Sequence, residues 1–306
     1  DTSTESVVNL GTNVLTLAAP ALAESAGAML VSSNTGAASK TITGSGAAAL
    51  TTSGGRNELV IHQYGLGNLN INVPITGTGA LVIAGPSTVN ASTIGSAGAV
   101  VLGAANTYSG RTYVNGAILS FSDATRLGAN PASATADQIQ FSGGTLRYTG
   151  TGYGDLANRG VLINGAGGTI DVTDGAAELR VRTIANQAST NYRGDLVKVG
   201  AGTLTLEGTL NTSNNASFTG LLDIRQGTLR LNGDNTGATG SITSTILGTN
   251  TSYADGTIFR PGANLAIQMG NLNNANEFII DEWLTFEGNN YVTVGSMNTG
   301  LTTPSG

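Results

Sequence analysis

The sequence of 306 residues contains no cysteine, which excludes disulfides, cysteine nucleophiles, cysteine zinc sites and iron–sulfur clusters. It contains a single histidine, so a multi-histidine metal site is excluded as well. Charged residues make up only 10% of the chain and aromatic residues only 5%. The only lysines are Lys40 and Lys198, and no basic cluster is present, so we expect no nucleic-acid partner.

Long hydrophobic runs are also missing, because no stretch of about 18 apolar residues could form a membrane span. The segment Val14–Ala23 resembles the apolar part of a signal peptide followed by an Ala-x-Ala cleavage site. The chain starts at Asp1 and has no positive charge before this segment. We therefore expect a mature or excised chain in which the segment is a strand followed by a short helical turn. The last residues, 302–306, are expected to be a linker or an excision point.

The residues that are abundant favour strands and tight turns. Apolar residues make up 40% of the chain, enough for a continuous core of Leu, Ile, Val and Ala. There are 45 glycines, and Thr, Asn and Ser fill much of the remainder. These residues suit strands and sharp corners far better than helices.

One short pattern recurs along the chain: glycine, a small residue or threonine, alternating apolar and polar residues, and then a turn. In one copy Leu204 and Leu206 point to one side of the chain, while Thr203 and Thr205 point to the other. Each copy therefore predicts a strand with one buried face. The clearest copies are 144–148, 168–172, 202–208 and 227–233.

The spacing of these copies predicts a solenoid, in which each coil places an equivalent strand on the one before. The leading glycines of all copies, clear and loose, are 46, 79, 98, 116, 144, 168, 202, 227 and 262, at intervals of 18 to 35 residues. Coils of about 22 residues would give roughly 14 coils and a rod about 65 Å long. The expected fold is all-β: a single right-handed parallel β-helix over 1–306. Within it we expect a candidate N-terminal cap at 1–40, repeat coils at 41–240, and C-terminal coils or a cap at 241–306.

The ends of such a solenoid carry open strand edges that need a cap. The Ala-rich stretch 18–31 is the candidate N-terminal cap and is expected to be partly helical. The stretch 277–286 carries the only tryptophan. It is interpreted as another coil, with a cap or a strand donated to a neighbouring subunit as alternatives.

The sequence resembles the autotransporter-associated β-strand repeat of bacterial type V passenger regions. The best copy runs over 98–112 and includes an Asn-Thr-Tyr-Ser-Gly corner at 106–110, followed by Val114, Gly116 and Leu119. A second copy begins at Lys198 and departs from the pattern by an insertion at 209–215. The resemblance is specific from about residue 70 to 233. It implies a right-handed parallel β-helix, export and a surface location.

Many parallel β-helices cleave polysaccharides with clustered carboxylates, so the acidic residues of this chain are candidate catalysts. No acidic pair recurs at equivalent positions, which favours solvated surface acids. The glycine-rich segment 165–171 lacks the iteration of calcium-binding repeats. His62 is expected to be a surface or stacking residue, and no cofactor or metal is expected. The candidate acids are Asp171 with Asp174, Asp223, and Asp281 with Glu282.

The tripeptide Arg193-Gly194-Asp195 matches a motif that adhesins present to integrins. We expect it in a loop before a strand, and an ordinary turn is the favoured interpretation of so short a match.

The sequence therefore predicts a non-enzymatic, extracellular or cell-surface β-helix with a structural or adhesive role. One alternative is a fibre subunit that polymerises end to end, and another is a carbohydrate-active enzyme. The expected partners are identical chains at the solenoid ends, surface glycans or host receptors.

Overall fold

A computed structural model gives the structure of the chain. It describes residues 5–18, 26–33, 37–53, 57–86, 98–187, 193–209, 218–234, 242–244, 247, 256–269, 278–280 and 282–296.

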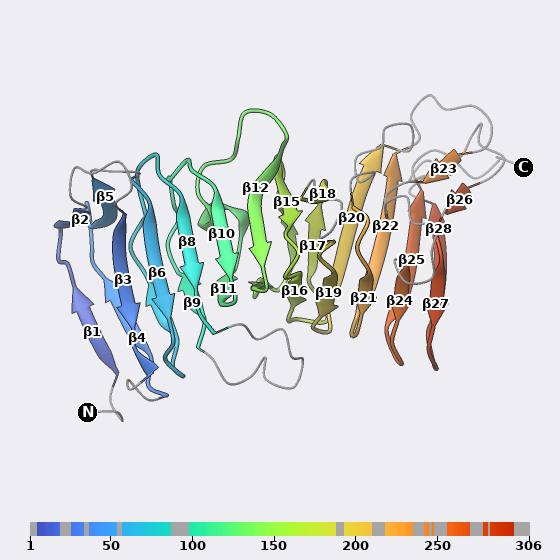
Figure 1. The fold of residues 1–306 in the computed structure, drawn as a ribbon, viewed down its shortest axis with the longest axis horizontal. Coiled ribbons are helices and arrows are strands. Elements are labelled where there is room, and N and C mark those ends of the chain that lie inside the picture. Colours follow the sequence, from blue (N-terminus) through green and yellow to red (C-terminus); the bar gives the residue numbers. More distant parts are fainter. Residues whose placement is uncertain are drawn as a thin grey trace, which may run out of the picture.

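The described residues form a parallel β-helix, as predicted. Every pair of neighbouring named strands runs in parallel, and the strands stack side by side along the long axis from the N-terminal to the C-terminal end (Figure 1). In a complete coil the chain passes through the faces named below as sheet 1, sheet 3 and sheet 2, and then returns to sheet 1. Strands far apart in sequence thus become neighbours.

Sheet 1 has eleven strands among the described residues and runs the length of the molecule. In spatial order its strands are β1 (Ser6–Asn9), β4 (Lys40–Thr43), β7 (Leu69–Ile71), β9 (Val100–Leu102), β11 (Ile118–Phe121), β13 (Thr145–Tyr148), β16 (Gly168–Val172), β19 (Leu196–Val199), β21 (Leu222–Ile224), β24 (Thr257–Phe259) and β27 (Leu284–Phe286).

Two further sheets complete the coils. Sheet 2 contains β3 (Gly27–Val31), β6 (Leu59–Gln63), β8 (Leu81–Ala84), β10 (Thr112–Asn115), β12 (Thr135–Ser142), β15 (Arg159–Ile163) and β18 (Ile184–Asn186). Sheet 3 contains β14 (Tyr153–Asp155), β17 (Glu178–Val181), β20 (Thr203–Thr209), β22 (Thr228–Asp234), β25 (Asn264–Met269) and β28 (Val292–Ser296). The remaining elements are the pair β2 (Val14–Ala18) and β5 (Ala49–Ser53), the pair β23 (Ile242–Ser244) and β26 (Phe278–Ile280), and the 3-10 helix η2 (Ala124–Leu127).

The coils are longer than the sequence spacing suggested. Sheet 1 begins at Ser6, and its last strand begins at Leu284, so ten steps along the sheet take 278 residues. The mean coil is therefore about 28 residues rather than 22, and ten steps at about 4.8 Å give a stack about 48 Å high. The leading glycines mark strands of different faces, because Gly144 precedes a sheet 1 strand whereas Gly202 precedes a sheet 3 strand.

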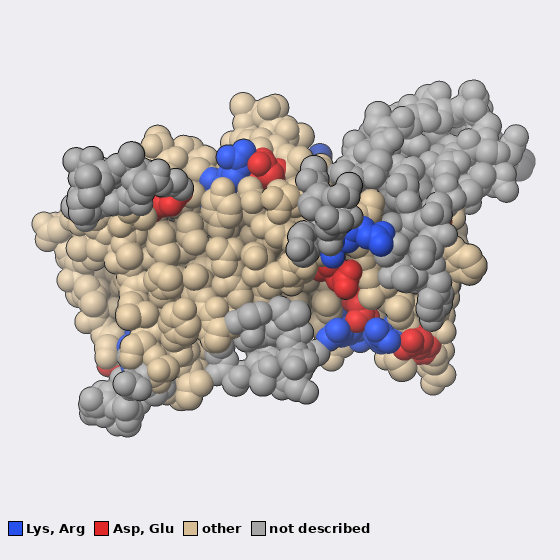
Figure 2. Space-filling view, in the orientation of Figure 1, with Lys and Arg blue, Asp and Glu red and all other residues tan. Residues whose placement is uncertain are grey.

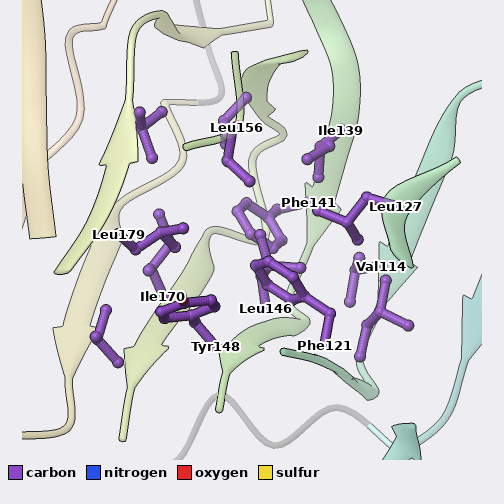
Figure 3. Packing of buried hydrophobic residues seen from close by; sticks show 14 of the residues in the cluster. Val114, Phe121, Leu127, Ile139, Phe141, Leu146, Tyr148, Leu156, Ile170 and Leu179 are labelled. Carbon is purple, nitrogen blue, oxygen red and sulfur yellow. The ribbon is translucent and has the colours of Figure 1, made fainter. Parts of the chain in front are cut away.

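The core consists of rows of inward-pointing side chains in register. Leu179, Leu204 and Leu229 occupy one row of sheet 3 and are fully buried. In sheet 1, the Phe121 ring packs at a tilt against the Tyr148 ring with centroids 5.3 Å apart, and neighbouring aliphatic side chains fill the space around them (Figure 3). Burial of a side chain of this size contributes about 1.5–3 kcal/mol. Because each row is continuous, the core stabilises the whole length of the rod.

Buried asparagine side chains form hydrogen bonds at the corners of the solenoid. The Asn186 carboxamide oxygen accepts hydrogen bonds from the backbone N–H groups of Thr219 (2.6 Å) and Gly220 (3.0 Å) in the next coil. The Asn106 carboxamide oxygen accepts one from Ile75 N–H (2.7 Å). Corner asparagines therefore bond the backbone of neighbouring coils and satisfy polar groups that a sharp corner would otherwise bury without partners.

The N-terminal region corrects one expectation. Residues 27–31 of the stretch expected to be partly helical form β3, which pairs in parallel with β6. The residues between β2 and β3 that could carry a helical turn, 19–25, lie outside the described residues. In Gly27–Val31 buried or half-buried positions alternate with exposed ones, which suits a pleated, half-buried strand, and this tertiary fit overrides the helix propensity of alanine. Whether 1–40 acts as a cap stays a prediction.

Candidate functional site at the corner of sheets 1 and 3

Charged side chains gather towards the C-terminal half of the molecule (Figure 2). Nine of the thirteen Lys and Arg residues lie at position 147 or later. Many of them belong to outward-pointing rows of sheets 1 and 3. Strands in register place side chains about 4.8 Å apart. Opposite charges on neighbouring strands therefore attract each other, and like charges repel.

The first charged row follows the outer face of sheet 1. Arg147 on β13 lies in register with Asp171 on β16, and the Arg147 Nε is 2.8 Å from the Asp171 carboxylate. Further along the solenoid, Arg225 and Arg260 immediately follow β21 and β24, which are neighbours in the sheet. Two like charges on adjacent strands would repel each other.

The Asp223 carboxylate prevents this repulsion. It accepts from Arg225 Nε at 2.9 Å through one oxygen and from Arg260 Nε at 2.8 Å through the other, and its side chain is only 4% exposed. Arg260 also reaches Glu287 at 3.1 Å. The hydrogen bonds that Arg260 donates to Asp223, together with those to Glu287, raise the pKa of Arg260 despite partial burial. The outer face of sheet 1 therefore carries Arg225 and Arg260 on either side of Asp223, an anion that both arginines share.

Lys198 is the exception within the core. Its position on β19 lies in register with Ile170 on one side and Ile224 on the other, in a row of buried apolar side chains. The side chain is fully buried, and its ammonium group donates to the carbonyl oxygens of Val199 (3.0 Å) and Gly200 (2.8 Å). Burial lowers the pKa of Lys198 to about 8, and the attraction of nearby Asp171 only partly opposes the shift.

A second charged surface covers sheet 3. Arg180 donates to Glu207 at 3.0 Å and lies over the Tyr153 ring, with 4.8 Å from the guanidinium carbon to the ring centroid. Arg182 pairs with Asp155 at 2.7 Å, which joins β14 to the residue after β17. These contacts are diagonal across neighbouring coils. The surface therefore carries balanced charge and holds one exposed tyrosine.

The two sheets meet at a corner that is hollowed. The turn between β19 and β20 is a short Gly-Ala-Gly sequence, whereas the preceding coil has the longer turn 173–177 and the following coil carries Arg225 and Gln226. Because the Gly-Ala-Gly turn is short and has almost no side-chain volume, it leaves an open hollow of about 610 Å³, here called the corner notch. Its lining residues are Asp171, Thr173, Val199, Gly200, Ala201, Arg225 and Gln226.

The candidate acids Asp171 and Asp223 are buried rather than solvated, so this expectation was wrong for both, and the candidate carboxylates in the described residues are bound by neighbouring groups. Asp174 accepts from the backbone N–H of Ala176 (2.8 Å) within its turn, while Asp171 and Asp223 are bound to arginines. Glu282 accepts from the Thr257 hydroxyl, and burial raises the pKa of Glu282 to about 8. Asp281 lies outside the described residues. In the part of the chain that the structure describes, each of these acids thus has a cation, a backbone amide or a hydroxyl as its partner.

The Arg193-Gly194-Asp195 tripeptide lies directly before β19, in a corner of the solenoid. Gly194 is buried, and its carbonyl accepts from the Asn186 side chain at 2.8 Å, while Arg193 and Asp195 are exposed. The Asp195 carboxylate accepts from the backbone N–H of Leu221 in the next coil at 2.9 Å. The tripeptide is therefore held by its neighbours in a fixed backbone conformation.

His62 lies on β6, with its ring nearly parallel to that of Tyr64 and the centroids 6.2 Å apart. Within the described ranges, no group of three or more His, Asp or Glu residues could hold a metal ion.

Sequence reasoning missed the buried Lys198, the shared anion Asp223 and the corner notch. The sequence contains a signal for the burial of Lys198. In the strand Leu196-Val197-Lys198-Val199, side chains alternate between the two faces, and Lys198 lies on the same inward face as Leu196. The other two features depend on which coils become neighbours, and the irregular coil lengths conceal that pairing.

Comparisons with known proteins agree with this architecture. Two stretches, residues 96–121 and 196–231, match the model of the Passenger-associated-transport-repeat, and they coincide with the two copies singled out in the sequence. The chain is also 31% identical over 209 residues to the Adhesin BmaC autotransporter of Brucella suis biovar 1 (strain 1330). That alignment covers 66% of this chain but only 6% of the relative. No solved structure matches the chain.

The fold and the repeats together define a parallel β-helix whose repeats are similar to those of autotransporter passengers. This chain carries two passenger-associated transport repeats and is distantly related to an autotransporter adhesin. A search of the described residues for a helix long and apolar enough to cross a membrane finds none.

Proposed function

We propose that this chain is a non-enzymatic structural and adhesive segment of a surface-exposed or secreted passenger. The observation that carries the proposal is the stack of parallel coils in register, which continues from β1 to β27 around one apolar core. Such a rod holds surfaces at a distance from their anchor. The relative that the chain resembles is named as an adhesin, which supports an adhesive role.

Attachment of coated beads to cultured host cells tests the adhesive role. Beads that carry the folded chain are expected to attach several-fold more than beads coated with albumin, and soluble chain is expected to compete. Beads coated with the heat-unfolded chain are the control for nonspecific stickiness. Equal attachment of folded chain and albumin would remove the adhesive half of the proposal and leave the structural half.

The tripeptide at 193–195 remains a proposed contact for an integrin-type receptor. Its two charged side chains are exposed, which supports access. The test is attachment of beads carrying Asp195→Ala, with Asp137→Ala as the control at a half-exposed surface aspartate. Loss of attachment for Asp195→Ala alone would support the contact, whereas unchanged attachment would dispose of it.

Polysaccharide cleavage is the contrary hypothesis to the non-enzymatic role. Incubation with acidic polysaccharides is expected to release no new chain ends, measured as reducing sugar or ultraviolet absorbance. Turnover that disappears in Asp171→Asn would overturn the proposal.

A fibre subunit is the second candidate, and the end of the solenoid favours it. Val292 and Val294 on β28 lie in register with the buried Leu265 and the partly buried Ile267 but are 52% and 72% exposed. At the other end, Val7 and Val8 on β1 are 56% and 52% exposed. Sedimentation velocity at rising concentration tests this candidate. Oligomers that Val294→Lys abolishes would support end-to-end assembly, and a monomer at all concentrations would contradict it.

A further inference from the structure

The corner notch has the dimensions and the chemical character of a small-ligand site. Its volume of about 610 Å³ lies within the usual range of such sites, roughly 300–1,000 Å³. A second hollow of about 400 Å³ adjoins it and shares Ala201, Arg225 and Gln226 with it. Together they form a groove along the corner over consecutive coils.

Both hydrogen-bond acceptors and hydrogen-bond donors line the notch, and they come from different coils. On β16, the Asp171 carboxylate is a pure acceptor, and one of its oxygens is bound by Arg147. Beyond β21, Arg225 uses its Nε on Asp223, and a guanidinium has four further N–H donors. The Gln226 side chain, whose carbonyl oxygen accepts from Gly200 N–H at 3.1 Å, has amide donors as well.

The base of the notch is small and mainly apolar. Val199, Gly200 and Ala201 line it between the polar residues. Gly200 has a φ of +79°, so any other residue there would be strained. The turn therefore carries no side chain at this position. The carbonyl oxygens of Val199 and Gly200 accept from the buried Lys198 ammonium. An apolar base between an acceptor and donors suits a ring with C–H groups on its face and hydroxyls at its edge.

The charge of the notch argues against an ionic ligand. Asp171 is paired with Arg147, and Arg225 is paired with Asp223, which Arg260 also contacts, so each charged lining residue already has a counter-ion. A charged ligand would have to compete with these pairs. Hydroxyl groups can instead accept from Arg225 or Gln226 and donate to Asp171 without breaking either pair.

We propose that the corner notch binds a neutral pyranose of a surface glycan, with Asp171, Arg225 and Gln226 as its hydrogen-bonding partners. The inference rests on the adhesive part of the proposed function and gives it a ligand class and a place on the rod.

Saturation-transfer NMR on the complete chain tests the inference. The probes are the methyl glycosides of glucose, galactose, mannose and N-acetylglucosamine, with glucuronate as the charged comparison. At least one neutral glycoside is expected to bind with a Kd on the order of 1 mM, as suits a single open site. Ala201→Leu should fill the notch and weaken that binding at least fivefold.

The matched control is Ala176→Leu, a second exposed alanine that lies in the neighbouring turn but does not line the notch. It should bind like the unmodified chain, and both variants should keep the circular dichroism and melting temperature of the parent. Three results would each overturn the inference: no binding of any neutral glycoside, binding of glucuronate alone, or binding unaffected by Ala201→Leu. Failure here combined with attachment of coated beads to cells would leave the adhesive proposal standing.

Discussion

At the residue scale, the unusual feature is a lysine in the core of the solenoid. Lys198 replaces an aliphatic side chain in a buried row between Ile170 and Ile224. Its ammonium is held by two carbonyl oxygens, which are dipoles and not full charges. A buried charge with only partial compensation costs free energy, and its pKa moves towards neutrality.

Lys198 is predicted to make stability rise with pH in the alkaline range. Its pKa is about 8 in the folded chain against an ordinary value of 10.5, so between these values the unfolded chain binds more protons. The free energy of unfolding should therefore increase from pH 8 to pH 10.5, by on the order of 3 kcal/mol, while below pH 8 the full cost is present. Denaturant unfolding at a series of pH values measures it.

Two variants of Lys198 isolate its contribution. Lys198→Met cannot titrate, and Lys198→Arg stays charged throughout this range, so both should lose the alkaline rise. A rise of the same size in Lys198→Met would contradict the assignment to this side chain.

Gly194 is predicted to be irreplaceable on steric grounds. A Cβ at this position would lie 1.9 Å from the Asn164 carbonyl oxygen in the neighbouring coil. Gly194→Ala should lower stability by roughly 2–4 kcal/mol or prevent folding, because the backbones must separate. Gly175→Ala is the control, since its nearest neighbour would be the Ala201 Cβ at 3.7 Å. Thermal melting compares the two, and equal melting temperatures would refute the close approach.

At the element scale, the register of the strands decides which charges meet. Arg225 and Arg260 follow neighbouring strands, and Asp223 lies between them with its carboxylate almost fully buried. Such a shared anion acts on both cations at once, and its removal leaves two like charges close together. Exposed ion pairs elsewhere should matter far less.

Asp223→Asn is predicted to destabilise the chain by about 1–3 kcal/mol, with part of the loss recovered at high salt because salt screens the Arg225–Arg260 repulsion. Asp137→Asn is the matched change, since Asp137 pairs with Arg111 on the surface with side chains 35% and 47% exposed. It should cost less than about 1 kcal/mol. Urea unfolding at low and high salt gives both numbers, and equal losses would contradict the shared-anion account.

At the scale of the whole molecule, each coil packs mainly against its immediate neighbours, so stability is distributed along one dimension. Interior strands are covered on both sides, whereas β1 and β28 have a neighbour on one side within the described residues. The exposed valines of these end strands agree with this difference.

Amide hydrogen exchange should therefore slow from both ends towards the middle. Backbone amides of β11 to β21 in sheet 1 are predicted to exchange only through global unfolding, and those of β1 and β28 through fraying, which is orders of magnitude faster. Mass-spectrometric detection resolves these segments. Protection of β28 equal to that of β20 would show that the solenoid end is covered, and would favour the end-to-end assembly discussed above.

The sequence alone determined the repeated strand, its alternation and the parallel β-helix. The Gly-Thr-Leu pattern at 202–204 and 227–229 reports local geometry, which each strand carries in its own residues. Stacking of Leu204 on Leu229 follows, since equivalent strands bury equivalent faces. The two repeat copies likewise indicated a resemblance to passenger repeats.

Only the tertiary structure decided the coil length, the burial of Lys198, the anion shared by Arg225 and Arg260, and the corner notch. Each depends on which residues of different coils become neighbours, and loops of unequal length between strands hide that register. A lysine in the inward phase of a strand is visible in the sequence, but whether carbonyl oxygens and Asp171 surround it is settled by packing. The side chains that form a site on a solenoid come from different coils. The register between coils, and not any single repeat, therefore determines which side chains meet.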